Sequence, residues 1–360
     1  MQGQKEQEAN AVIRKCLGSK GIYASPARYR DQCWTRDFVL AAEPWLLIGQ
    51  RADLLALVRE HLHQLALRQT PDGKIPIMFL DNQTRWLLSK IGHTIKNFRM
   101  SFLLKRFLSK DGLASLSPWT TDSELMFVLG ILQYAHATNN LQLNIDCAGN
   151  INSAIAYIEN YLLRGGLMRG VDWRDTRPDL KDKQLLSNNC FLYQMYVLDG
   201  NELAARAVRD KINEKFWTGE YYRDYPETEE WDTLGNALAI LYDVAPPEYW
   251  GSIFWKVTDF DTDFGYRING VTLPAKSEAE AKVMARTNQY GVIWPFVHHF
   301  MTLALIKAGN YQQAQAKFLQ MDRLLGFFEW YDPQTGQGHG SPDQLWSAAL
   351  YLRVLDALSK

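Results

Sequence analysis

The sequence predicts an all-α protein folded as an (α/α)6 toroid, in which two concentric rings of helices surround one central axis. Apolar residues recur every three to four positions along almost the whole chain, whereas the alternating runs typical of strands are rare and short. Strongly apolar helices alternate with more polar ones, and the two members of a pair are joined by very short links. Because short links make antiparallel neighbours, we expect six helical hairpins.

Twelve helices are expected from this periodicity. They lie at residues 4–18, 38–49, 52–69, 121–138, 145–163, 184–199, 201–215, 232–242, 246–257, 294–308, 310–325 and 342–357. The links Gly49-Gln50-Arg51, Gly200 and Gly309-Asn310 place a glycine where a helix ends, because glycine readily adopts the left-handed conformation of a C-terminal cap. A basic stretch at about 85–110 is an addition to the pattern.

Six of these helices are apolar nearly all round and must therefore be covered on every side. They are Phe38–Gly49, Thr121–Thr138, Asn188–Leu198, Asp232–Tyr242, Trp294–Lys307 and Pro342–Leu355. An inner ring covered by six partners satisfies this need, and its long connections then open on one rim. The alternatives are an open α-solenoid, which usually has a stricter period, and two separate bundles, which would need a polar linker near the middle. We expect residues 1–360 to form one domain, although the length alone favours two.

Charge and cysteine content exclude several classes of protein. Lys+Arg 39 against Asp+Glu 40 gives a net charge of −1, so the basic surface of a nucleic-acid-binding protein is not expected. Four distant cysteines form neither a zinc motif nor a disulfide framework. The first residues lack a signal peptide's apolar region, and no apolar run reaches ~18 residues. We therefore expect a cytoplasmic protein without integral membrane association, metal or cofactor; the sequence does not indicate its oligomeric state.

Each long connection places a tryptophan beside polar, mostly acidic side chains. Aromatic rings stack on the apolar face of a pyranose, while carboxylates, amides and arginine hydrogen-bond to its hydroxyls. The sequence therefore predicts a pocket at the rim for a small carbohydrate. The candidate substrate-binding residues are Trp34, Arg36, Asp37, Trp119, Asp122, Asp172, Trp173, Trp231, Asp232, Gln289, Trp294, Tyr331, Gln344 and Trp346.

Structural roles are an alternative for several of these residues. Asp37, Asp122 and Asp232 precede or begin apolar helices, where an aspartate often caps the helix N-terminus. An ion pair between Arg36 and Asp37 is the alternative to a sugar contact, and a tryptophan near a helix end is often a core residue. The repetition in all six connections is what favours the sugar pocket. The His298-His299 pair lies within an apolar helix and is expected to be a buried core feature.

Four segments, in the same order, resemble motifs of the (α/α)6 inverting glycosidases. These enzymes include the α-glucosidases of glycoside hydrolase family 63, the amylo-α-1,6-glucosidase part of glycogen debranching enzyme, the alkaline/neutral invertases and, more distantly, trehalases. The segments are Trp34-Thr35-Arg36-Asp37-Phe38, Asp172-Trp173-Arg174-Asp175, Gln289-Tyr290-Gly291-Val292-Ile293-Trp294-Pro295, and 329–336 together with 344–349. The resemblance spans roughly residues 30–357.

The resemblance implies an inverting glycosidase that cleaves an α-glucosidic bond of a small glucoside or oligosaccharide. Its general acid would be Asp175, with Asp172 as the competing candidate, and its general base would be Glu329. Inversion requires the two carboxyl groups to lie ~6.5–9.5 Å apart, leaving room for the attacking water. The resemblance further implies that Arg36 and Asp37 grip the sugar. The alternative for Glu329 is a surface position beside an aromatic pair.

Two other functions remain open on the sequence. A sugar 2-epimerase on the same toroid would need paired histidines facing the pocket, for which only His298, His299 and His339 are available. A non-catalytic carbohydrate-binding toroid would use the pocket without turnover. The basic segment 85–110 is interpreted as a lid that would favour an acidic or phosphorylated aglycone; a membrane-surface helix and a solvated hairpin are its alternatives.

Overall fold

The computed structural model describes residues 2–47, 52–82, 84, 114–115, 120–274, 277, 281 and 285–360. Every one of the expected helices has a helical counterpart within these ranges. The basic segment 85–110, Trp119 and the link Gly49-Gln50-Arg51 lie outside the described residues, so the expectations about them stay predictions. Within the described ranges, no helix combines the length and apolar character needed to cross a membrane.

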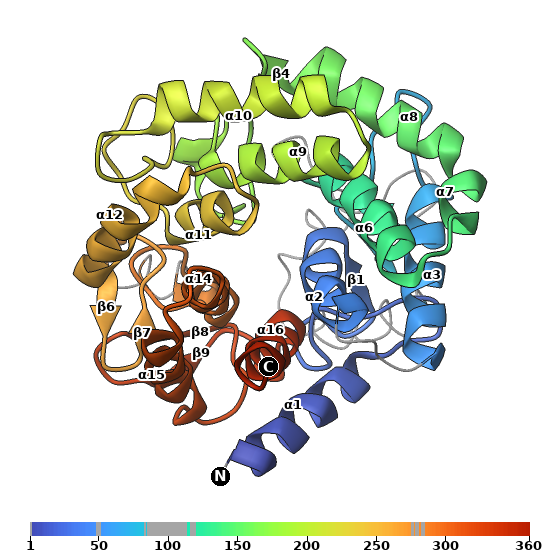
Figure 1. Ribbon diagram of the computed structural model, residues 1–360. Helices are drawn as coiled ribbons and strands as arrows, with labels where there is room; N and C mark the ends of the chain where they lie inside the picture. Colours follow the sequence, from blue (N-terminus) through green and yellow to red (C-terminus); the bar gives the residue numbers. More distant parts are fainter. Residues whose placement is uncertain are drawn as a thin grey trace.

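Six buried helices form a closed inner ring. They are α2 (Thr35–Leu47), α6 (Ser123–Thr138), α9 (Leu186–Leu198), α11 (Thr233–Leu241), α14 (Pro295–Lys307) and α16 (Leu345–Leu358). Each packs on the next, and α16 packs back on α2 (Figure 1). This closure excludes an open solenoid and two separate bundles, so the predicted (α/α)6 toroid is confirmed.

An outer helix covers each inner helix. The outer helices are α1 (Gln2–Cys16), α3 (Ala52–Ala66), α8 (Ala148–Tyr157), α10 (Glu202–Phe216), α12 (Pro247–Val257) and α15 (Tyr311–Asp322). The helix expected at 145–163 is broken into α7 (Gln142–Asp146), α8 and a π-helical turn, Ile158–Leu162. The first helix, α1, packs on the last, α16, so the two ends of the chain form the sixth pair.

Small residues let the two rings pack closely and let the hairpins turn. A Cβ atom on Gly130 of α6 would lie 2.9 Å from a Val39 methyl of α2 and 3.0 Å from a Leu62 methyl of α3. Glycine at this position therefore allows the three helices to approach one another. At the predicted turns, Gly200 and Gly309 have φ of +75° and +78°, as the sequence indicates for helix-ending glycines.

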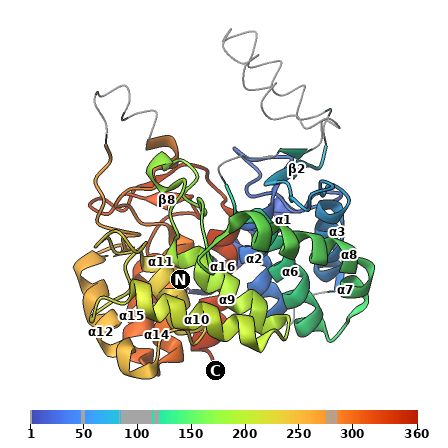
Figure 2. The same ribbon diagram turned by 90° about the horizontal axis from the view of Figure 1, so that it is seen from above.

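Short antiparallel strands lie at one end of the ring (Figure 2). A three-stranded sheet joins β1 (Gln32–Trp34), β2 (Met78–Leu80) and β3 (Ala114–Ser115), with Gln32 opposite Leu80 and Met78 opposite Ser115. The hairpins are β4–β5 (Leu163–Arg164 and Leu167–Met168), β6–β7 (Asp261–Thr262 and Gly265–Tyr266) and β8–β9 (Trp330–Tyr331 and Gly338–His339). Single-turn 3₁₀ helices lie at Pro178–Leu180, Thr258–Phe260 and Ala285–Thr287.

A ring of backbone hydrogen bonds ties the connections together at this end. Near the start of each inner helix, one backbone N–H donates to a carbonyl of the next connection along the chain. The six bonds are Thr35 to Ile77 (2.9 Å), Thr121 to Val171 (3.2 Å), Leu186 to Asp224 (2.8 Å), Thr233 to Ile268 (3.0 Å), Ile293 to Tyr331 (3.1 Å) and Leu345 to Ala24 (2.9 Å). The last bond closes the ring, so side chains on these connections are held at fixed positions around the axis.

Candidate active site

A cavity at the rim collects residues from the first, third, fifth and sixth connections. Its described lining consists of Tyr29, Trp34, Arg36, Asp37, Trp173, Asp175, Thr287, Gln289, Trp294, Glu329 and Trp346. Nine of these were predicted from the sequence, including both members of the candidate acid–base pair. The second and fourth connections contribute no described lining residue.

Glu329 is held from three sides although it is almost fully buried. The Tyr29 hydroxyl donates to Oε1 at 2.9 Å, the Ser341 backbone N–H donates to Oε2 at 2.9 Å, and Arg28 Nη1 lies 3.3 Å from Oε2. Burial raises the pKa of Glu329, and the contacts with Arg28, Tyr29 and Ser341 oppose that rise. Gly340 has φ of +74°, and a Cβ there would lie 2.7 Å from the Glu329 Cβ, so the loop can pass this close only with glycine.

Asp175 faces Glu329's cavity from the third connection and keeps part of its carboxylate accessible. Its Oδ1 accepts a hydrogen bond of 3.4 Å from the Gln289 amide, and its Oδ2 lies 3.6 Å from Arg36 Nη2. Gln289 is itself fixed, because its amide donates to the Trp173 carbonyl at 3.0 Å and its Oε1 accepts from the Thr176 N–H at 3.0 Å. Gln289 therefore ties the fifth connection to the loop that carries Asp175.

Arg36 and Asp37 complete the polar wall. Arg36 Nη1 donates to Asp122 at 3.0 Å, and its Nε lies 3.9 Å from Asp37. Burial raises the pKa of Asp37 to about 7; Glu329 and Asp175 act in the same direction, and Arg36 opposes them. The cavity thus holds three carboxyl groups, with Arg36 beside Asp37 and Asp175 and Arg28 beside Glu329.

Four tryptophans supply the apolar wall. Trp173 packs edge-on against Trp294 with ring centres 5.0 Å apart, and Trp294 packs edge-on against Trp346 at 5.9 Å. Trp34 lies on the first connection and is partly exposed. The indole N–H groups of Trp173 and Trp346 are buried without a hydrogen-bond partner among the described residues. Aromatic faces and free donors beside carboxylates suit the mixed apolar and polar surface of a sugar.

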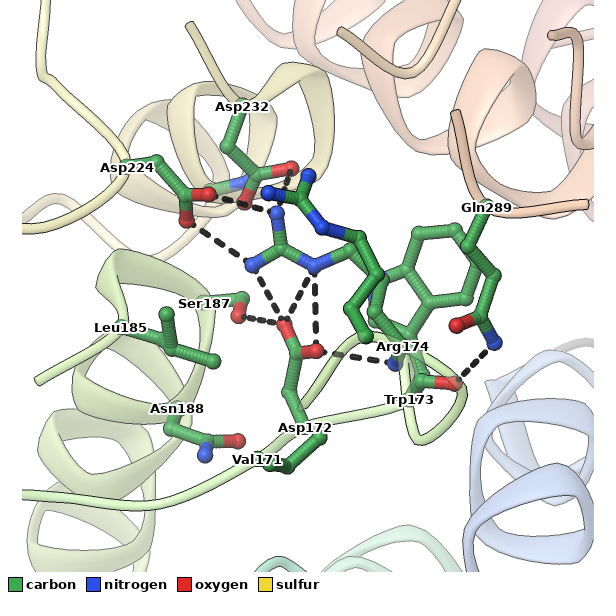
Figure 3. Close-up of polar contacts among 12 residues, drawn as sticks. Val171, Asp172, Trp173, Arg174, Leu185, Ser187, Asn188, Asp224, Asp232 and Gln289 are labelled. Atoms are coloured by element: carbon green, nitrogen blue, oxygen red, sulfur yellow. Dashed lines mark hydrogen bonds and ion pairs between the residues drawn. The ribbon is translucent and has the colours of Figure 1, made fainter. Parts of the chain in front are cut away.

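Asp172 and Asp232 do not line the cavity, contrary to the sequence-based expectation. Both surround Arg174, which is fully buried (Figure 3). Asp172 accepts from Arg174 Nη2 at 2.9 Å and from the Ser187 hydroxyl at 2.6 Å. Although burial alone would raise its pKa, Arg174 and these hydrogen bonds lower the pKa of Asp172. Asp232 caps α11 by accepting from the Gly235 N–H at 2.9 Å, which is the structural role left open by the sequence.

Four other predicted residues also lie behind the lining. Asp122 contacts Arg36, and Gln344 donates to Asp37 at 3.3 Å, so both act on cavity residues from outside. Trp231 stacks on Phe260, and the Tyr331 hydroxyl donates to backbone carbonyls. These two side chains therefore stabilise the surrounding structure and do not face the cavity. The proximity of a tryptophan to an acid in the sequence therefore did not distinguish residues that line the cavity from residues that lie behind it.

Sequence reasoning missed Arg28, Tyr29 and Thr287. Tyr29 and Thr287 line the cavity, and Arg28 contacts Glu329 and donates to the Thr287 hydroxyl at 3.0 Å. Arg28 and Tyr29 lie 300 or more residues from Glu329 in the chain. The available signal was the unusual length of the first connection, which brings them to the rim shortly before β1.

The histidine pair is structural. His298 Nδ1 accepts from the Tyr266 N–H at 3.0 Å, and its Nε2 lies 3.1 Å from the Lys317 carbonyl. Burial lowers the pKa of His298 to about 3. His299 is equally buried, and neither residue lines the cavity. In the part of the chain that the structure describes, no group of three His, Cys, Asp or Glu side chains is placed to hold a metal ion.

Sequence comparison gives only a local match. The chain matches no known family model. A segment of 68 residues is 35% identical to the mannosylglycerate hydrolase of Rubrobacter radiotolerans. That segment covers 18% of this chain and 15% of the relative.

Structural comparison extends over nearly the whole chain. A wild-type glycosidase has a TM-score of 0.68 at 16% identity, covering 99% of this chain and 96% of its own. The family 63 mannosylglycerate hydrolase of Thermus thermophilus in complex with glucose has a TM-score of 0.67 at 15% identity, covering 97% and 99% of the two chains. The same hydrolase with Tris and D-glycerate scores 0.66 at 14% identity with the same coverage. The chain therefore has the (α/α)6 fold of these glycoside hydrolases, as the resemblance in sequence motifs implies.

Proposed function

We propose that the protein is an inverting glycoside hydrolase that acts on a small α-linked glycoside. The observation that carries this proposal is that Asp175 and Glu329 line one cavity together with an arginine and four tryptophans. The pair was chosen from sequence motifs that lie more than 150 residues apart, so their meeting was not imposed by local sequence. The fold shared with glycosidases adds support.

Asp175 suits the role of general acid better than Asp172. Asp172 is fully buried, and Arg174 and Ser187 occupy its oxygens. A carboxylate whose pKa is lowered in this way has no proton to give. Asp175 reaches the cavity and its side chain is 26% exposed. In the proposed reaction it protonates the glycosidic oxygen as the C1–O bond breaks.

Glu329 acts as the general base in this mechanism. A water on the face of the sugar opposite the leaving group attacks C1, and Glu329 accepts one of its protons. Donors at Tyr29, Ser341 and Arg28 favour the ionised form that the step requires. The products are the free sugar with inverted configuration and the aglycone alcohol, and the step leaves Asp175 ionised and Glu329 protonated, so atoms and charge balance.

We further propose a hexose linked to a small acidic aglycone as the substrate class. Two relatives are named mannosylglycerate hydrolases, and the structure of one contains D-glycerate. In this chain the Arg28 side chain is 38% exposed next to Glu329. A guanidinium at that place can form a paired contact with a carboxylate. The tryptophans and Arg36 with Asp37 would then hold the hexose.

The 2-epimerase alternative is weakened by the buried histidines, and the non-catalytic alternative needs a direct test. The protein is incubated with α- and β-glucosides, sucrose, trehalose, mannosylglycerate and glucosylglycerate, and the released anomer is followed by NMR. We expect an α-glycoside to release the β-anomer first. Release of the α-anomer would refute inversion, epimerisation without cleavage would favour the epimerase, and binding without turnover would favour the non-catalytic toroid.

A further inference from the structure

A second cavity lies at the end of the ring opposite the rim. It has a volume of about 350 Å³, which falls within the range of about 300–1,000 Å³ for ligand pockets. Four inner helices, α2, α11, α14 and α16, enclose it near their C-terminal ends; Figure 1 views the ring from this end. The described lining is Glu43, Pro44, Leu241, Tyr242, Phe300, Leu303, Ile306, Lys307, Leu350, Arg353 and Ala357.

Two polar groups in this mostly apolar cavity make no hydrogen bond to a described residue. Glu43 of α2 is one of them; it is partly exposed, and the burial of its carboxyl group raises its pKa to about 7. The Tyr242 hydroxyl is buried and has no hydrogen-bond partner among the described residues. Leaving the buried Tyr242 hydroxyl unpaired costs roughly 1–3 kcal/mol, so a ligand that pairs with it gains affinity.

The charges around the cavity leave Glu43 available for a cation. Lys307 Nζ lies 2.7 Å from Asp243 and donates to the Leu241 carbonyl at 2.8 Å, so its charge is already engaged. Arg353 opposes the rise in the pKa of Glu43, but its guanidinium lies 3.2 Å from Asp356, which also pairs with Lys360. The surrounding helix C-termini carry partial negative charge and favour a cation.

We propose that this cavity binds a small organic ammonium ion with a short apolar chain. The ammonium group lies at the Glu43 carboxylate within reach of the Tyr242 hydroxyl, and the chain packs against Phe300, Leu303 and Leu350. An ammonium supplies the donors that Glu43 lacks, whereas a carboxylate ligand would meet Glu43 as a like charge. This site is separate from the cavity of Asp175 and Glu329 and does not depend on the function proposed for them.

Isothermal titration calorimetry, which measures the affinity of the full chain for butylammonium chloride, tests the proposal. At pH 8 we expect one binding site, with butyrate and 1-butanol binding at least tenfold more weakly. Affinity should fall about tenfold between pH 8 and pH 6, because protonation of a carboxyl with a pKa of about 7 removes the partner charge. Equal affinity for 1-butanol, preference for butyrate, or an affinity independent of pH would each refute the proposal.

Variants locate the bound ion. Glu43→Gln should weaken butylammonium binding at least tenfold, while Glu248→Gln, an exposed control on α12, should not change it. Glu329→Gln should also leave the affinity unchanged, because Glu329 lies in the other cavity. Binding lost in Glu329→Gln but kept in Glu43→Gln would place the ion at the rim and overturn the inference. The pH dependence of the unmodified protein needs no variant, so a failure of Glu43→Gln to fold does not block the test.

Discussion

Two arginines near the rim, Arg36 and Arg174, each meet three aspartates, yet their clusters differ in geometry. Arg174 is completely buried, and its hydrogen bonds to Asp172 and Asp224 are 2.7–3.2 Å long. Asp232 is the third acid, at 3.9 Å. This cluster joins the third and fourth connections and leaves no open side for a ligand.

Arg36 holds its aspartates more loosely. Only Asp122 lies at hydrogen-bond distance, 3.0 Å, whereas Asp175 and Asp37 lie at 3.6 and 3.9 Å. Both of these looser carboxyls line the rim cavity. The same residue types therefore support the fold where the acids are fully buried around the arginine, and form a candidate site where some of the carboxyls also line a cavity.

The largest expected effect is on catalysis at the cavity. Asp175→Asn and Glu329→Gln should each lower kcat about 100- to 10,000-fold, because each removes a proton-transfer group. The free energy of unfolding should change by less than about 2 kcal/mol, since neither residue belongs to the Arg174 cluster. Steady-state kinetics and urea denaturation measure the two quantities. A matched control, Asp182→Asn, alters an exposed carboxylate and should change neither; normal turnover in both variants would reject the pair.

The second largest effect is expected on the stability that the Arg174 cluster gives to the fold. Arg174→Met should lower the free energy of unfolding by about 3–5 kcal/mol, because buried carboxylates lose their counter-charge. Arg36→Met should cost less, since Asp175 is partly exposed and the pKa of Asp37 is already about 7, which eases its protonation. Urea denaturation of the two variants at pH 7 gives the comparison. Equal losses in the free energy of unfolding would mean that both arginine clusters stabilise the fold to the same extent, contrary to this expectation.

The sequence carried most of the information about the fold. Helical periodicity marked every inner and outer helix that the structure describes, because a buried inner helix must be apolar nearly all round. It missed the break between α7 and α8 and placed the start of α2 at Phe38 instead of Thr35. Helix ends depend on hydrogen bonds such as that of the Thr35 N–H to the Ile77 carbonyl, which connects distant parts of the chain.

The candidate site was predicted less completely, for a physical reason. Motifs pointed to Asp175 and Glu329 as the candidate acid–base pair, and both line the cavity, but the direction in which a side chain points is not encoded in its spacing. Asp172 and Asp232 share the tryptophan-and-acid pattern with cavity residues, yet both turn toward Arg174. Tyr29 shows the opposite error, because its contact with Glu329 comes from closure of the ring and not from any local motif.

A smaller effect is expected on the pH profile. The hydrogen bond from the Tyr29 hydroxyl lowers the pKa of Glu329. Tyr29→Phe removes this bond, so the pKa of Glu329 should be higher in the variant than in the unmodified protein. The base works in its ionised form, so the acid limb of kcat/KM should move to higher pH, by about 0.5–1 unit. Activity well above that limb should change little. A limb that stays in place would show that Glu329 is not the group that titrates.

The smallest effect is expected at Asp232, the loosest member of the Arg174 cluster. Burial raises the pKa of Asp232 to about 7, so its neutral form is accessible at pH 7; Asp232→Asn mimics that form, and its amide oxygen can still accept from the Gly235 N–H. We expect a change in the free energy of unfolding below about 1 kcal/mol, whereas Asp232→Ala, which loses the cap, should cost about 1 kcal/mol more than Asn. Urea denaturation at pH 7 measures both. A loss for Asp232→Asn as large as that for Arg174→Met would mean that the 3.9 Å contact with Arg174 carries full charge, and that all three acids of the Arg174 cluster act alike.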